Sequence, residues 1–312
     1  MFFELFNIVF ESNFEIPEIP ASNTSRHAVW RITLDKKTRP NIESPFYDWV
    51  HEWNEPSIQI ARNPSGFLIR FPTVADFCIC AEAGEIRINT SVTVNSTLIR
   101  HLLLDQVIPR LIGQIGKLVL HSSAALTKTG KCVVFLGHSG YGKSTLAAAC
   151  AKNGGNVLAD DSVCMEFDGK RTFISPSYAG LRLNADSLSI LSDDRSVFSE
   201  LDNYSLKTRL IPKTSQKIYF ENKYTVDGIF LLRDPKSNTP NAPTARPCNT
   251  SDINRLIGAL FMIDPTDKSN NILLYKQLMM LLKQKNLTYA LNTKHDYQQL
   301  ESVIALIDSV LG

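Results

Sequence analysis

The stretch CVVFLGHSGYGKSTLAAACAK, residues 132–152, decides the fold of this chain. Its apolar beginning predicts a β-strand, and the run that starts at Lys143 predicts a helix. Between them, the residues from Gly137 to Ser144 match the pattern G-x-x-x-x-G-K-[ST] at every fixed position. A strand, this loop and a helix in that order indicate a phosphate-binding loop within an α/β domain.

The chemistry of phosphate binding explains these residue types. Glycine lets the backbone bend until successive N–H groups point at phosphate oxygens, and the helix presents its positive N-terminus to the same anion. Lys143 would reach the β- and γ-phosphates, and the Ser144 hydroxyl would ligate Mg²⁺. A glycine-rich turn without a ligand is the alternative. We assign nucleotide binding to the consecutive residues Gly137, His138, Ser139, Gly140, Tyr141, Gly142, Lys143, Ser144 and Thr145.

Two adjacent carboxylates come next along the chain. Gly154 and Gly155 should end the helix, and NVLADDSVCMEF, residues 156–167, is the next expected strand. The helix leads roughly 16 Å away from the loop, and the extended segment returns about 20 Å. Asp160 and Asp161 should therefore lie level with the loop. Because neighbouring strand residues point to opposite sides, one carboxylate can hold Mg²⁺ while the other faces an acceptor hydroxyl. An Asp-Asp turn or a helix cap is the alternative.

A histidine on the preceding strand is placed by a similar count. If residues 118–127 and 131–137 form a hairpin centred on Thr129, His121 lies opposite Gly137, at the mouth of the loop. A lone histidine near an apolar strand is also commonly a satisfied core residue. Both readings of His121 stay open.

The chain divides into two expected domains. Residues 1–94 are rich in alternating apolar runs separated by turn residues, which predicts a β-rich N-terminal domain. Strands alternate with helices over residues 118–312, so residues 95–312 are predicted to form an α/β domain that contains the loop. Asn95 can cap a helix over LIRHLLLDQVIPRLIGQIG, residues 98–116, and Pro109 should kink or split it.

The second half carries further local signals. DGIFLLRD is an expected strand, and the last residues, LTYALNTKHDYQQLESVIALIDSVL, predict a strand followed by an amphipathic helix. Residues 192–225 are polar, and 234–252 read as a long exposed loop. Four basic residues of the first polar stretch either clamp a substrate or belong to a solvated loop: Lys207, Arg209, Lys213 and Lys217.

Composition excludes several classes of protein. The 312 residues contain 33 Lys+Arg and 31 Asp+Glu, so the net charge is +2 (33 − 31), which gives no electrostatic footprint for nucleic acid. No uninterrupted apolar run is long enough for a membrane span, and the N-terminus lacks the basic region of a signal peptide. Six cysteines in so long a chain do not indicate a disulfide framework. We therefore expect a cytoplasmic protein that engages neither nucleic acid nor membrane.

The residues LHSSAALTKTGKCVVFLGHSGYGKSTLAAACAKNGGNVLADDSV, 120–163, resemble the catalytic core of the HPr kinase/phosphorylase family. They also resemble its relatives, a serine-kinase group that includes kinases found with lasso-peptide biosynthesis genes. PSYAGLRL, residues 176–183, is similar to a segment of these lasso-type relatives. The likeness is good over residues 118–191 and holds only in outline elsewhere.

This resemblance implies a phosphoenolpyruvate-carboxykinase-like nucleotide fold, ATP with Mg²⁺, and phosphoryl transfer to a serine hydroxyl. Thr145-Leu146-Ala147 replaces the E-T-A of bacterial HPr kinases, and SYAGLRL replaces their E-I-R-G-L-G. The phosphorylase activity and the protein HPr as substrate are therefore not expected. Position by position, Lys143 and Ser144 match the family's phosphate-loop pair, Asp160 its general base, Asp161 its metal-side carboxylate and His121 its strand histidine. Arg182 lies in the family-like segment and could neutralise the charge of the transferring phosphate. We therefore expect Asp160, His121, Lys143 and Arg182 to be catalytic, and Ser144 and Asp161 to bind the metal.

Three functions are consistent with these features. The first is an ATP- and Mg²⁺-dependent kinase whose acceptor is a serine-type hydroxyl of a peptide, protein or small molecule, a lasso-peptide precursor among them. The second is a nucleotide-binding regulator without transfer. The third, a carboxykinase-like enzyme, is disfavoured by the short chain and by the lack of a carboxylate-binding motif. A second carboxylate favours the kinase over the regulator, and homo-oligomerisation stays open.

Overall fold

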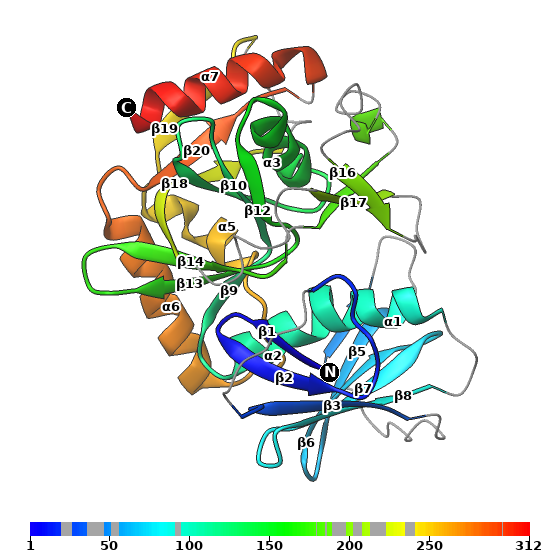
Figure 1. Cartoon of the computed structure of the whole chain (residues 1–312). Helices are drawn as coiled ribbons and strands as arrows, with labels where there is room; N and C mark the ends of the chain where they lie inside the picture. Colours follow the sequence, from blue (N-terminus) through cyan, green and yellow to red (C-terminus); the bar gives the residue numbers. More distant parts are fainter. Residues whose placement is uncertain are drawn as a thin grey trace. The chain divides into compact units, whose positions relative to one another are not determined.

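The computed structural model describes residues 1–19, 27–35, 47–50, 56–90, 95–178, 180–184, 186–188, 198–201, 208–212, 223–234, 241–294 and 296–312. The chain divides into two compact units, Met1–Ile108 and Pro109–Gly312 (Figure 1). The division falls inside the helical segment that the sequence placed after a boundary at residue 94. An ion pair explains the difference, because Arg100 of that segment donates to Glu18 at 2.8 Å.

The first unit contains one sheet of eight described strands, in the spatial order β1-β2-β3-β8-β7-β6-β5-β4. Most neighbours are antiparallel, and β3 runs parallel to both β2 and β8. The two hairpins that the turn residues predict are present as β5–β6 and β7–β8. The strands are β1 (Phe2–Leu5), β2 (Ile8–Ser12), β3 (Trp30–Asp35), β4 (Tyr47–Val50), β5 (Pro56–Asn63), β6 (Gly66–Phe71), β7 (Ala75–Cys80) and β8 (Glu85–Asn89).

The helical segment after residue 95 is interrupted before its proline. The Asn95 side chain caps it by accepting from the Thr97 N–H at 2.8 Å, as predicted. The segment then runs through α1 (Ser96–Leu102), the π-helical turn η1 (Leu103–Val107) and α2 (Ile108–Gln114). Proline lacks an N–H and its ring clashes with the preceding turn, so a wider π-helical turn just before Pro109 accommodates it.

The second unit is a mixed α/β fold, as predicted. Its main sheet has the order β12-β10-β11-β18-β14-β13-β9, with β20 beside β18 and β19 beside β20. These strands are β9 (Leu118–Leu120), β10 (Ser122–Leu126), β11 (Cys132–Leu136), β12 (Asn156–Ala159), β13 (Val163–Phe167), β14 (Thr172–Pro176), β18 (Tyr224–Leu232), β19 (Thr244–Pro247) and β20 (Thr288–Asn292).

Helices cover both faces of this sheet (Figure 1). Leu146 of α3 and Val303 of α7 pack with Phe135 and Phe230 on one face, whereas Leu278 of α6 joins the core on the other. Among the described helices, none combines the length and apolarity that crossing a bilayer requires. The helices are α3 (Lys143–Lys152), α5 (Ile253–Ile257), α6 (Lys268–Lys283) and α7 (Leu300–Leu311), with 3₁₀ turns η3 (Thr250–Asp252) and η4 (Tyr297–Gln299).

Three expectations about the second unit need correction. The single strand predicted over 156–167 is two strands, β12 and β13, because the chain turns at Asp160–Ser162. The polar stretch 192–225 contains β16 (Phe198–Leu201) and β17 (Thr208–Pro212), and β17 pairs with both β16 and β15 (Leu181–Leu183). The exposed loop expected over 234–252 contains β19, which is held by its pairing with β20.

Gly155 holds the end of α3 close to β10. Gly154, at φ +88°, ends the helix as predicted, and the Gly155 N–H donates to the Cys150 carbonyl at 2.9 Å. A Cβ atom on Gly155 would lie 2.0 Å from the backbone carbonyl oxygen of Leu126. Only glycine fits at this position without moving the helix that follows the loop.

We therefore expect Gly155→Ala to destabilise the protein by about 2–3 kcal/mol, the scale of a core overpacking change. Gly258→Ala is the matched control, because its Cβ would meet only ordinary contacts, at 3.6 Å and 3.7 Å. Denaturant unfolding of both variants measures the difference. Equal stability of Gly155→Ala and the wild type would contradict the close packing of α3 on β10.

Candidate functional site

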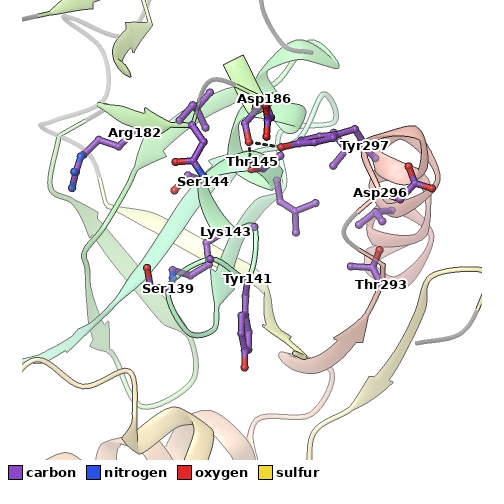
Figure 2. A pocket seen from close by; sticks show the side chains of 18 of the residues that line it. Ser139, Tyr141, Lys143, Ser144, Thr145, Arg182, Asp186, Thr293, Asp296 and Tyr297 are labelled. Atoms are coloured by element: carbon purple, nitrogen blue, oxygen red, sulfur yellow. Dashed lines mark hydrogen bonds between the residues drawn. The ribbon is translucent and has the colours of Figure 1, made fainter. Parts of the chain in front are cut away.

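Three neighbouring strands of the second unit end at one edge of its main sheet. β11 pairs with β18 in parallel, and β18 pairs with β20 in the same way. Ligands of open α/β sheets bind beyond the carboxyl ends of such strands. The loops that follow β11 and β20 line one cavity of about 360 Å³ (Figure 2). We take this cavity as the candidate site.

The loop between β11 and α3 has the backbone that its glycines predict. Gly140 has φ +83° and Gly142 has φ +90°, a left-handed conformation that favours glycine at both positions. Lys143 is buried, with only 6% of its surface exposed. Its Nζ atom donates to the carbonyl oxygens of Gly137 at 2.9 Å and His138 at 3.1 Å. The ammonium is thus held inside the curve of the loop.

The residues assigned to nucleotide binding divide into two groups. Those from Ser139 to Thr145 line the cavity, whereas Gly137 and His138 are not among its lining residues. Gly137 and His138 instead position Lys143 through their carbonyls. The His138 ring packs edge-on against Tyr141, with 5.3 Å between ring centroids.

Asp160 follows β12 directly and is buried. Its Oδ1 atom accepts hydrogen bonds from Ser144 Oγ at 2.9 Å and from Ser123 Oγ at 2.5 Å, and Oδ2 accepts from the Arg182 backbone N–H at 3.0 Å. Burial, and then the charge of Asp161, raises the pKa of Asp160 to about 6, although these hydrogen bonds act against the rise. A divalent cation beside this carboxylate would lower that pKa.

Asp161 points into different surroundings. It has φ +62°, so the chain leaves the extended conformation here and the side chain reaches the cavity wall. One carboxylate oxygen lies 3.9 Å from His121 Nε2, and the other lies 3.6 Å from an Arg182 guanidinium nitrogen. The two carboxylates face different neighbours, as predicted, but because of a left-handed residue rather than because of strand alternation.

His121 occupies a break between two strands. β10 and β11 pair Ser122 with Leu136, so the hairpin is centred on Thr129 and its register places His121 opposite Gly137, as predicted. The expected first strand is divided, however, because β9 pairs with β13 whereas β10 pairs with β11 and β12. The His121 side chain is 37% exposed and lines the cavity, which argues against the core-residue alternative.

The opposite wall of the cavity was not foreseen from the sequence. It is formed by the segment after β20, including Thr293, Asp296 and Tyr297, and by Ser187. Ser187 Oγ lies 3.2 Å from Thr145 Oγ1 and 2.9 Å from the Tyr297 hydroxyl. The sequence indicated this wall only indirectly. The loop after a parallel strand begins at the carboxyl edge of the sheet, where the loop after β11 also begins.

Ser123 is a second residue that sequence reasoning missed. It is fully buried on β10 and donates to Asp160. Its signal was a hydroxyl on the strand, next to Ser122 and two residues from His121. A buried polar group needs a partner, and such a residue beside an acidic pair is a candidate for holding it in place.

The donor set suits magnesium better than a resident transition metal. Within the described residues, no three His, Cys, Asp or Glu side chains gather closely enough to hold a metal ion. A hydroxyl, Ser144, and a carboxylate, Asp160, lie 2.9 Å apart beside the loop. Mg²⁺ is usually bound through one or two carboxylates together with phosphate oxygens and waters. The residues present therefore fit Mg²⁺ that arrives with a phosphate ligand.

The structure does not test the basic residues proposed as a substrate clamp. Lys207, Lys213 and Lys217 lie outside the described residues, and Arg209 is described only through its backbone in β17. Arg182, by contrast, lies on β15 and lines the cavity.

Comparisons with known proteins add little to this site. No protein-family model matches the sequence, and a search of curated proteins finds no significant match. Among solved structures, the chain is similar to the HPr(Ser) kinase/phosphatase from Coxiella burnetii, with 11% sequence identity over 61% of this chain and 94% of that chain. The TM-score of 0.32 is too low for inferences about activity. Function is therefore inferred from the site residues.

Proposed function

We propose that this protein is an ATP- and Mg²⁺-dependent kinase that transfers the γ-phosphoryl group to a serine-type hydroxyl. One observation carries the proposal: Ser144 of the glycine-rich loop donates to buried Asp160, while Asp161, Arg182 and His121 line the same cavity. A loop that only binds nucleotide needs a lysine and a metal contact. The wall adds the Asp161 carboxylate, the Arg182 guanidinium and the His121 imidazole. Such groups can accept a proton and offset negative charge, which phosphoryl transfer requires.

The loop would hold the phosphates. Its left-handed glycines turn the backbone around Lys143, and the N-terminus of α3 lies there. On nucleotide binding, the Lys143 ammonium would exchange the Gly137 and His138 carbonyls for phosphate oxygens. The charge it supplies is the main reason that the loop would select a polyphosphate.

Ser144 and Asp160 would hold Mg²⁺. When bound there, the ion would supply positive charge that offsets the charge developing during transfer. Ser123 and the Arg182 backbone N–H keep the Asp160 carboxylate oriented toward Ser144. The burial of Asp160 also disfavours its negative charge, so a cation there stabilises the ionised carboxylate.

Asp161 would accept the proton of the acceptor hydroxyl. As the hydroxyl oxygen forms its bond to the γ-phosphorus, the bond to the β–γ bridging oxygen breaks, ADP leaves, and the proton passes to the Asp161 carboxylate. The Arg182 guanidinium, 3.6 Å from Asp161, can neutralise the transferred group, and His121 faces the other carboxylate oxygen. All three side chains line the cavity that a hydroxyl would enter.

This division exchanges the roles that the family resemblance implies for the two carboxylates. The resemblance makes Asp160 the base and Asp161 the metal-side residue. Two observations support the exchange. Asp160 accepts a hydrogen bond from Ser144, whose hydroxyl is the expected Mg²⁺ ligand, and Asp161 is the carboxylate that lines the cavity. A buried Asp160 with three hydrogen-bond donors has little freedom to meet an incoming acceptor.

A transfer assay tests the proposed function. The protein is incubated with Mg²⁺ and γ-labelled ATP against peptide pools that contain serine, threonine or alanine at one position, and against small hydroxyl compounds. We expect label to be transferred to serine-containing acceptors, lasso-type precursor peptides included, and none to the alanine pool. Tight ATP binding with no transfer to any acceptor would instead support a nucleotide-binding regulator.

A further inference from the structure

The cavity continues past the phosphate loop, away from the carboxylates. Ser144 and Thr145 are successive residues of α3, so their side chains point about 100° apart around the helix axis. Ser144 contacts Asp160, whereas Thr145 contacts Ser187, which in turn contacts Tyr297. Figure 2 shows Lys143 and Ser144 between Arg182 on one side and Thr293, Asp296 and Tyr297 on the other. The site therefore has two ends with the loop between them.

The charge that develops during transfer indicates which end of the cavity would hold the terminal phosphate and which the nucleoside. Transfer requires the terminal phosphate beside the carboxylates and Arg182, because charge develops there. The rest of the nucleotide must then extend from the loop in the other direction, past Thr145. That direction leads to the wall formed by Ser187 and by the segment after β20.

The groups on this wall suit a nucleoside. Tyr297 offers a partly buried aromatic ring, and Leu300 and Val303 of α7 add an apolar surface. The polar side chains of Thr293 and Asp296 lie beside them on the same wall. A flat heteroaromatic base stacks on an aromatic ring, and ribose hydroxyls donate to oxygen acceptors. Hydroxyl contacts at Ser187 connect Tyr297 with Thr145 of the loop, so the ring lies on the same cavity as the loop.

We infer that Thr293, Asp296 and Tyr297, together with Ser187, form the nucleoside subsite, in which the Tyr297 ring stacks on the base of a nucleoside 5′-triphosphate. This inference rests on the proposed function, because it takes the Gly137–Ser144 loop to hold the phosphates of the same ligand.

Two probes separate the subsite from the phosphate loop. Mg²⁺·ATP carries a nucleoside, whereas inorganic tripolyphosphate with Mg²⁺ carries only the phosphate chain. Calorimetric titration of the full chain should show that Tyr297→Ala weakens ATP binding about tenfold, within the range for a lost base-stacking contact. Tripolyphosphate binding should stay within about twofold of the wild type, because the probe has no base to stack. Tyr297→Phe keeps the ring and should bind ATP almost normally.

Tyr275→Ala is the matched control, because Tyr275 is a half-exposed tyrosine on α6 that does not line the cavity. An equal loss of ATP and tripolyphosphate in Tyr297→Ala would mean that the ring only supports the loop, and it would overturn the subsite. Unchanged ATP binding in Tyr297→Ala, or an equal loss in Tyr297→Phe, would overturn it as well. If the wild type binds tripolyphosphate and ATP with equal affinity, the subsite alone is refuted. A wild type that binds neither probe would refute the proposed function and the subsite together.

Discussion

Replacing Lys143 with alanine is expected to abolish most nucleotide binding and to lower any phosphoryl transfer by at least about 10²-fold, the scale for a removed charge-stabilising donor. Lys143 is buried and its ammonium lies within the curve of the loop, 2.9 Å from the Gly137 carbonyl. No other described lysine or arginine lies on the loop itself. Calorimetric titration with Mg²⁺·ATP, and with Mg²⁺·tripolyphosphate, gives the readout.

The Lys143 ammonium contacts two carbonyl oxygens, so a substitution there can change the shape of the loop as well as its charge. Alanine removes both the charge and two hydrogen bonds that shape the loop. Lys143→Met also removes the charge and both hydrogen bonds but keeps most of the buried stem, so it should bind nucleotide as poorly as Lys143→Ala while melting closer to the wild type. Lys128→Ala is the control, since Lys128 is exposed in the turn between β10 and β11. Normal ATP affinity in Lys143→Met would refute the phosphate-loop assignment.

Asp160→Asn and Asp161→Asn are expected to impair phosphoryl transfer in different ways. Asp161→Asn should lower transfer by about 10²–10⁴-fold, the usual scale for a lost general base, while Mg²⁺·ATP binding stays within a few fold of the wild type. Asp160→Asn should instead raise the Mg²⁺ concentration needed for half-maximal transfer, with part of the rate recovered at high Mg²⁺. The contact between Asp160 and Ser144, and the exposure of Asp161 to the cavity, are the physical reasons.

Mg²⁺ titrations of transfer and of ATP binding, run on both variants, separate the roles. The opposite pattern, with transfer lost in Asp160→Asn at normal metal affinity, would restore the assignment that the family resemblance implies. Identical behaviour of the two variants would contradict any division of labour between them. Asp168→Asn is the control, since Asp168 is an exposed aspartate in the turn between β13 and β14.

The parts of the site that could be predicted from sequence depend on contacts between near neighbours. Gly142 and Gly154 adopt left-handed conformations at the start and end of α3, and both positions could be identified because glycine accepts this conformation without strain. The hairpin centred on Thr129 joins strands that are adjacent in sequence. The return of the chain to Asp160 needed only the lengths of one helix and one strand.

Long-range pairing decided the rest. The break at His121 exists because β9 pairs with β13 and not with β11, a choice that depends on competing strands elsewhere in the sheet. That Ser123 donates a hydrogen bond to Asp160 could be recognised only from the pairing of β10 with β12. Tyr297 reaches Ser187 across more than a hundred residues of sequence. Local sequence determines the conformation that each segment prefers, so the sequence by itself determined the glycine-rich turn from Gly137 to Ser144 and the helix that follows it. Burial and strand order decide which distant segments meet, so only the tertiary structure determined the cavity walls around that turn.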